Sequence, residues 1–239
     1  MSNRGKGATG SRVSSRLEAK RKENAFSVSN NAFQTVKFKL SKIRKQAVTS
    51  GISSKRAAIN AVKSEFTGRG FVRLSDADAG PFLAHFRKYK SSKSVIGTLD
   101  HKKRPTSMFG FSEIKNNGRG EDGTPDPMGT RLSSDDRSHG FPVSQLINPD
   151  HGNKQHFMVG ENWLGNQGTT QGMEQLMSSM HKSDTNGPFF GKFRQVEYSG
   201  DETRPSLIRD TMLRRTASLN HIDAFSIEHD NEDIDRMHV

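Results

Sequence analysis

The chain has 239 residues, a formal net charge of +11 and no cysteine, which excludes disulfides and thiolate zinc sites. Phe, Leu, Val and Ile together make up about a fifth of it, a level at which disorder becomes common. No apolar run approaches the length of a membrane span. These features predict a mostly disordered protein with one small folded unit.

The charge is divided unevenly along the chain. Residues 1–104 hold 24 Lys and Arg against 6 Asp and Glu, whereas residues 105–239 hold 13 against 20. A basic front and an acidic tail indicate a partner that is a polyanion. The acidic part is expected to bind a second partner or to compete with the polyanion.

Residues 1–29 are rich in Ser, Gly, Lys and Arg, which predicts a disordered basic arm. A small all-α unit of three amphipathic helices is expected over residues 30–92. A spacing of 3, 4, 3 and 4 between the apolar residues from Phe33 to Ala47 predicts the first helix. Capping serines and apolar stripes predict the other two, over residues 53–68 and 75–90.

The rest of the chain is expected to be flexible, with one helical exception. Residues 93–169 are rich in Gly, Asn, Asp and Ser, and a structureless run of that length indicates disorder. A short amphipathic helix is predicted over residues 170–182. Residues 183–218 read as a second flexible region, in which two arginines precede a candidate phosphorylation site at Ser218, and residues 219–239 read as an acidic tail.

The helix over residues 170–182 carries an apolar stripe that nothing nearby in the sequence is expected to bury. Because methionine suits adaptable surfaces, we expect this stripe to dock on a groove of another protein. The docking residues are Met173, Leu176, Met177 and Met180.

Basic side chains in the arm and on the predicted helices are expected to contact phosphates, which supply affinity with little sequence information. An ordinary core helix with a solvated basic face is the alternative for the stretch from Phe33 to Ala47. The predicted nucleic-acid contacts are Arg4, Lys6, Arg12, Arg16, Lys20, Arg21, Lys22, Lys37, Lys39, Lys42, Arg44, Lys45, Lys55, Arg56, Arg69 and Arg73.

No catalytic motif stands out. His151 and His156, with His139 upstream, are the nearest approach to a metal site, and they are interpreted as polar loop residues. We therefore predict no catalytic residue, no metal site and no cofactor.

The sequence as a whole favours a non-enzymatic, intracellular nucleic-acid-binding protein, nuclear or nucleocytoplasmic, that prefers RNA to DNA. A virus-encoded accessory protein or a nuclear regulatory factor would suit this design. One alternative is a protein-interaction adaptor that docks through its helices on an acidic or groove-presenting partner. A weaker alternative is a peripheral membrane-surface protein. Self-association of the small helical unit is left open.

Overall fold

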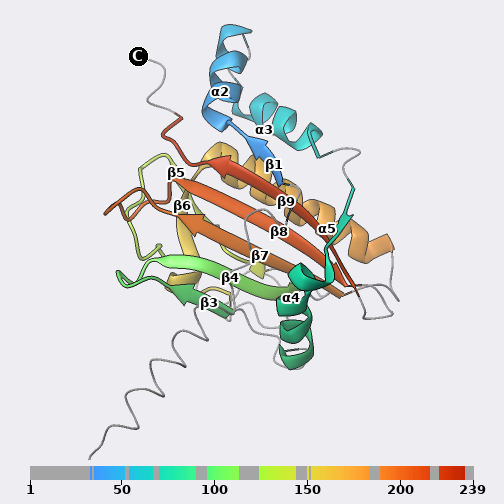
Figure 1. Ribbon diagram of the computed structural model, residues 1–239. Helices are drawn as coiled ribbons and strands as arrows, with labels where there is room; N and C mark the ends of the chain where they lie inside the picture. Colours follow the sequence, from blue (N-terminus) through green and yellow to red (C-terminus); the bar gives the residue numbers. More distant parts are fainter. Residues whose placement is uncertain are drawn as a thin grey trace, which may run out of the picture.

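The computed structural model describes ten stretches of the chain. They are residues 33, 35–51, 54–66, 70–89, 96–112, 124–143, 150, 152–183, 189–215 and 221–234. In them the chain forms a mixed α/β fold, with a large sheet between two layers of helices (Figure 1). The predicted fold class, a mostly disordered chain with a small all-α unit, is therefore wrong.

The large sheet has seven strands, and its centre is an antiparallel meander of β7, β8 and β9. The strand order is β1 (Thr35–Phe38), β9 (Ile222–Asp230), β8 (Leu207–Arg215), β7 (Phe189–Glu197), β4 (Pro105–Ser112) and β3 (Ile96–Leu99), with β2 (Val72–Arg73) also paired to β9. Only β1 runs parallel to its neighbour; the other pairings are antiparallel.

Opposite charges face each other across the central strands and fix their register. Arg194 on β7 lies opposite Asp210 on β8, and Arg209 on β8 lies opposite Glu228 on β9. Each arginine donates Nε to its partner carboxylate, at 2.7 Å and 3.0 Å respectively. Cross-strand ion pairs stabilise one register, because a slip by one residue would move every side chain to the other face.

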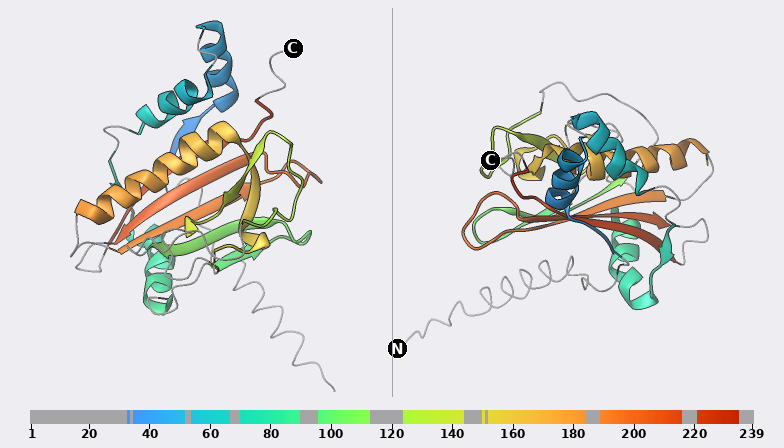
Figure 2. Two further views of the ribbon diagram at one scale, coloured as in Figure 1. Left: turned by 180° about the vertical axis from the view of Figure 1, so that it is seen from behind. Right: turned by 90° about the horizontal axis from the view of Figure 1, so that it is seen from above.

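Helices cover both faces of the sheet (Figure 2). One face carries α2 (Leu40–Thr49), α3 (Lys55–Ser64) and α5 (Gln171–Ser183), packed over a core that includes Trp163, Met212 and Ile227. The other face carries α4 (Asp76–Tyr89), packed on Phe109, Phe193 and Leu213.

A small second layer lies on the same face of the sheet as α5 (Figure 2). It consists of the antiparallel pair β5 (Asp135–His139) and β6 (Met158–Asn162), with the 3₁₀ turn η3 (Gln155–Phe157) before β6. A π-helical turn, η4 (Gly165–Thr170), then leads directly into α5. Phe141, Phe157 and Val159 pack this layer against Met108 and Ile208 of the sheet.

The predicted elements are correct in part. The second and third predicted helices form as α3 and α4, but the first is divided. Thr35–Phe38 is a strand because its backbone pairs with β9, and only the chain from Leu40 onward is helical. The expected flexible region 93–169 contains four strands, and the expected acidic tail contributes the central strand β9.

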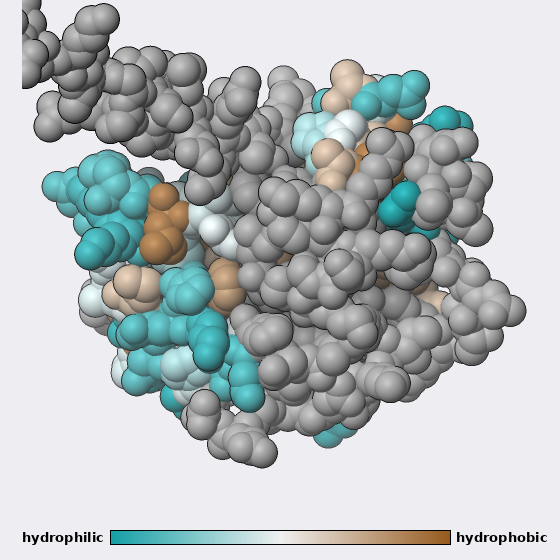
Figure 3. All heavy atoms as spheres, turned by 90° about the horizontal axis from the view of Figure 1, so that it is seen from below, coloured by the Kyte–Doolittle hydropathy of each residue, from teal (hydrophilic) through white to brown (hydrophobic). Residues whose placement is uncertain are grey.

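The surface of the described residues is mostly hydrophilic where Figure 3 shows it. Large hydrophobic side chains are exposed singly, at Val48, Val72, Leu99 and Met128. Across the described stretches, no helix combines the length and the apolar character that crossing a membrane requires.

The methionine stripe on α5 lies in the core and does not form an exposed docking face. Met173 and Met177 are fully buried, and Leu176 and Met180 pack partly buried against the same cluster. The expectation that nothing nearby would bury this stripe was wrong, because the large sheet and the packing of α3 beside α5 were not anticipated.

Replacing Met177 with alanine should therefore destabilise the fold by about 2–5 kcal/mol, the range for truncating a buried methionine. Met128 is 43% exposed, so Met128→Ala provides the control and should change stability by about 0.5 kcal/mol or less. Urea unfolding of both variants measures the difference. Equal stabilities would contradict the buried position of Met177.

Candidate active site

A polar cleft of about 390 Å³ lies where β5 meets η4 and the start of α5. Arg137 and His139 are two residues apart on β5, so their side chains leave the same face of the strand. The residues that line the cleft are Thr124, Arg137, His139, Pro142, Val143, Asn166, Gln171 and Glu174.

His139 is held by a side-chain amide. Its Nε2 lies 3.0 Å from Oδ1 of Asn153. An amide oxygen only accepts hydrogen bonds, so in the neutral ring the proton is on Nε2 and the proton-accepting nitrogen is Nδ1. Half-buried at the cleft wall, His139 has the tautomer and the position of a general base.

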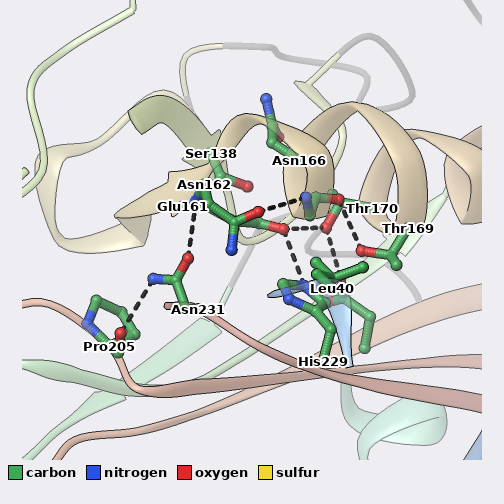
Figure 4. A network of polar contacts seen from close by, with 12 residues as sticks. Leu40, Ser138, Glu161, Asn162, Asn166, Thr169, Thr170, Pro205, His229 and Asn231 are labelled. Atoms are coloured by element: carbon green, nitrogen blue, oxygen red, sulfur yellow. Dashed lines mark hydrogen bonds and ion pairs between the residues drawn. The ribbon is translucent and has the colours of Figure 1, made fainter. Parts of the chain in front are cut away.

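Asn166 is oriented by a carboxylate on the neighbouring strand. Asp136 Oδ2 accepts hydrogen bonds from Nδ2 of Asn166 at 3.0 Å and from Nε2 of Gln167 at 2.9 Å. Because the carboxylate engages the amide nitrogen, the oxygen of Asn166 is left to accept from, or coordinate, another group. In Figure 4, Asn166 extends away from the buried network below it.

The π-helical turn that carries Asn166 is shaped by close contacts around its first residue. Asn162 Oδ1 accepts a hydrogen bond from the backbone N–H of Gly165 at 2.8 Å. A Cβ atom on Gly165 would lie 2.7 Å from Cε1 of His229 and 2.9 Å from Oε1 of Glu161, so only glycine fits there. Such π-turns are rare and frequently occur at functional sites.

A buried arginine joins this turn and β5 to the large sheet. Arg194 donates Nε and Nη2 to Asp210 at 2.7 Å and 2.6 Å, and Nη2 also to Thr170 at 2.7 Å. Its Nη1 donates to Ser138 at 2.8 Å and to Glu161 at 3.2 Å. Ser138 directly precedes His139, so this guanidinium fixes the strand that carries the candidate base.

The buried charges strongly shift one another's pKa values. Burial alone would raise the pKa of Glu161, but Arg194 and His229 outweigh burial and lower it to about 2. Burial opposes ionisation of Asp210 too, and Arg194 again prevails, so its pKa is lowered. Burial would lower the pKa of His229, whereas its 3.0 Å contact with Glu161 raises it.

Glu174 connects the cleft to the same network. Its Oε1 lies 3.4 Å from Nζ of Lys192, a fully buried lysine that is also 3.6 Å from Asp210 Oδ2. Burial raises the pKa of Glu174, and the positive charge of Lys192 opposes that shift. The position of this cleft carboxylate is therefore set by its ion pair with a buried lysine.

None of the predicted site residues lines this cleft. Lys37, Lys39, Lys42, Lys45, Lys55, Arg56 and Arg73 are exposed on β1, α2, α3, β2 or the residues beside them, and Arg44 is buried. The seven arm residues, Arg69 and Ser218 lie outside the described residues. Nucleic-acid contact by these cations, and phosphorylation of Ser218, stay predictions.

Sequence reasoning missed the residues of the cleft. His139 was considered only as a metal ligand, and Arg137, Asn153, Asn166 and Glu174 were not considered. The usable signal was the alternation in "DDRSH", which places Arg137 and His139 on one face if that segment is a strand.

No family model matches this chain, and no curated protein sequence matches it. Similar solved structures include NucA from Streptococcus agalactiae with a magnesium ion bound, which is 15% identical with a TM-score of 0.40 over 54% of this chain and 68% of that one. The metal-free NucA structure is 14% identical with a TM-score of 0.39 over the same shares. Sda1 nuclease with a bound zinc ion is 13% identical with a TM-score of 0.41, over 58% and 74%.

The interpretation as a disordered, non-enzymatic accessory protein of a virus is corrected by these findings. The similar solved structures are nucleases, and the chain folds into an ordered α/β structure. At these identities and TM-scores the likeness assigns no activity to this chain.

The lowered pKa of Glu161 makes the fold sensitive to acid. A carboxylate whose pKa falls from 4.5 to about 2 on folding contributes stability above pH 4.5, and this contribution is lost as the pH falls toward 2. The loss should reach about 3 kcal/mol. Glu161→Gln should be less stable at pH 7, and its unfolding free energy should depend less on pH in this window.

Urea unfolding at several pH values between 7 and 2.5 measures this effect. Glu202→Gln, a change at an exposed glutamate, serves as the control and should keep the pH dependence of the parent protein. Identical pH profiles for Glu161→Gln and the parent would rule out an ionised Glu161 in the folded state.

Proposed function

We propose that this chain is a nuclease, which hydrolyses phosphodiester bonds of nucleic acid in the cleft between β5 and α5. The observation that carries the proposal is the position of His139, whose Nε2 is engaged by Asn153 while Arg137 stands beside it on the same strand face. A general base next to a phosphate-binding cation is the arrangement that attack of water on a phosphodiester requires.

In the reaction, Nδ1 of His139 accepts a proton from a water molecule as the water oxygen forms a bond to phosphorus. The P–O bond to the leaving nucleoside breaks, and the leaving oxygen takes a proton from solvent. Arg137 binds the non-bridging oxygens, since a guanidinium donates to phosphate in a bidentate fashion. Its Nη1 donates to the backbone oxygen of Thr124 at 2.7 Å, which aligns the side chain along the cleft wall.

The oxygen donors of the cleft fit a magnesium-type ion. Asn166 offers an amide oxygen and Glu174 a carboxylate, and in the described stretches no three His, Cys, Asp or Glu side chains form a closed metal cluster. This fits a hydrated ion held by few protein ligands and by substrate phosphate, not a tetrahedral zinc centre. When bound, such an ion would stabilise negative charge on the phosphate.

The net positive charge of the chain favours nucleic acid over other phosphodiesters as the substrate. The chain carries 37 Lys and Arg against 26 Asp and Glu, with a basic segment at residues 1–29. A polymer of phosphates is the ligand that such a surplus attracts over long range. The sequence suggested a preference for RNA over DNA, and a comparison of the cleavage rates of the two substrates tests it.

Replacing His139 with alanine should lower the cleavage rate about 10²–10⁴-fold, because the general base is lost. His156→Ala is the matched control, since that histidine is exposed outside the cleft, and it should keep full activity. The assay follows cleavage of labelled RNA and DNA with magnesium and after chelation by EDTA. Equal activity of the two variants would sink the assignment, and so would a parent protein that cleaves neither substrate.

Asn153 is expected to act as a positioning residue through His139. Asn153→Asp keeps an oxygen that accepts from Nε2 and should preserve most of the activity, whereas Asn153→Leu frees the ring and should lower kcat about tenfold or more. The pH–rate profile separates positioning from folding, because the added negative charge of Asn153→Asp should shift the acidic limb, on which His139 loses its proton, to higher pH. Indistinguishable profiles for both variants would refute this role.

A further inference from the structure

Helices α2 and α3 form a hairpin without a single negative charge. No Asp or Glu occurs between Lys37 and Ser64. The cations in this span are Lys37, Lys39, Lys42, Arg44, Lys45, Lys55, Arg56 and Lys63. Among the described residues, Lys37 and Lys39 are the two cations of this span that lie within reach of carboxylates on the sheet, those of Glu228 at 3.3 Å and Asp230 at 3.9 Å.

Two of these cations share one aromatic ring. The guanidinium of Arg44 lies 5.5 Å and the ammonium of Lys55 lies 4.9 Å from the ring centre of Trp163. Arg44 is buried, and its Nε and Nη1 have no hydrogen-bond partner in the described part of the chain. Two positively charged side chains therefore lie against this indole, and no carboxylate among the described residues neutralises them. They make this side of the hairpin strongly electropositive.

One face of α3 presents a polar stripe outward. Arg56, Asn60 and Lys63 are spaced i, i+4 and i+7, so they lie along the same face of the helix. Ala58 and Val62 occupy the opposite face and are fully buried in the core beneath. Because the apolar face is already packed, the stripe keeps a fixed direction relative to the core.

The stripe ends at the cleft. Lys63 Nζ donates a hydrogen bond to Oε1 of Gln171 at 3.0 Å, and Gln171 lines the cleft one turn before Glu174. Val62 packs against η4 so closely that a Cβ on Gly168 would lie 3.0 Å from its Cγ1. Helix α2, by contrast, packs on α3 and on β9.

We propose that Arg56, Asn60 and Lys63 bind the phosphate backbone of a nucleic acid strand whose scissile bond lies in the cleft. This inference rests on the proposed function and specifies its substrate as a polymer that extends beyond the cleft. Arg56 and Lys63 are seven residues apart, about 10 Å along a helix, which matches about three nucleotides of one strand.

A lipid surface is the other polyanion that a basic helix can bind, but the hairpin lacks the apolar face that this requires. The large hydrophobic residues of α2 and α3 pack into the core, and Val48 is the only one on their described surface that is exposed. Phosphate binding without insertion is the mode that the surface supports.

The test compares two variants of the full chain with equal loss of charge. Arg56→Gln/Lys63→Gln removes two cations of the α3 stripe, and Lys42→Gln/Lys45→Gln removes two exposed cations of α2. The α3 variant should lose about tenfold in kcat/KM on a long labelled oligonucleotide at about 0.15 M salt. The slope of its logarithmic binding constant against the logarithm of the salt concentration should decrease by the equivalent of about two phosphate contacts. The α2 variant should show a smaller decrease in slope and in kcat/KM.

A small diester, bis(p-nitrophenyl) phosphate, reports on the cleft alone, and its hydrolysis should be unchanged in Arg56→Gln. If the α2 and α3 variants lost the same factor in kcat/KM on the oligonucleotide, the inference would be overturned. The same holds if Arg56→Gln slowed hydrolysis of the small diester as much as cleavage of the oligonucleotide. If the parent protein bound phosphatidylserine vesicles but no oligonucleotide, the inference would be wrong, and the ligand of the stripe would be a lipid surface. If the parent protein cleaves nothing while the α3 variant still binds oligonucleotide more weakly, the proposed function fails and the binding stripe stands.

Discussion

The fold depends on the burial of one arginine. The guanidinium of Arg194 is fully buried, yet its donors meet Asp210, Thr170, Ser138 and Glu161, which come from four different elements. Taking these ions out of water opposes folding, and only dense pairing offsets that penalty. The loss of a carboxylate would leave buried positive charge poorly compensated, and the loss of a hydroxyl would leave a buried donor unsatisfied, so β5, β6, η4 and β8 are held in one arrangement.

The cleft takes its geometry from this joint. Ser138 holds β5 against the sheet, and the next residue along the strand is His139. Thr170 holds the end of η4, the turn that carries Asn166, and Lys192 extends the same network to Glu174. The residues facing solvent are thus fixed by contacts that lie behind them, as a preorganised site requires.

The sequence predicts the helices better than the sheet, for a physical reason. Helix α3 and the stripe of α5 show their apolar spacing within a short window. The central strands carry charges that a local reading assigns to a phosphorylation motif or an acidic tail. Those charges are buried because Arg209 meets Glu228 and Arg194 meets Asp210 across strands, and no local pattern shows which residues will face each other.

The cleft was harder still to predict, because its residues become neighbours only through the fold. Asn166 lies on a π-helical turn, Glu174 lies on the α-helix that follows it, and Asn153 approaches His139 from a loop. Once the fold is known, the charges divide into two classes. Those of the sheet are matched in pairs and position the cleft, whereas those of α2 and α3 are largely unmatched and lie beside it. Because the charges of the sheet are paired while those of the two helices are not, the positive potential accumulates on the helices beside the cleft.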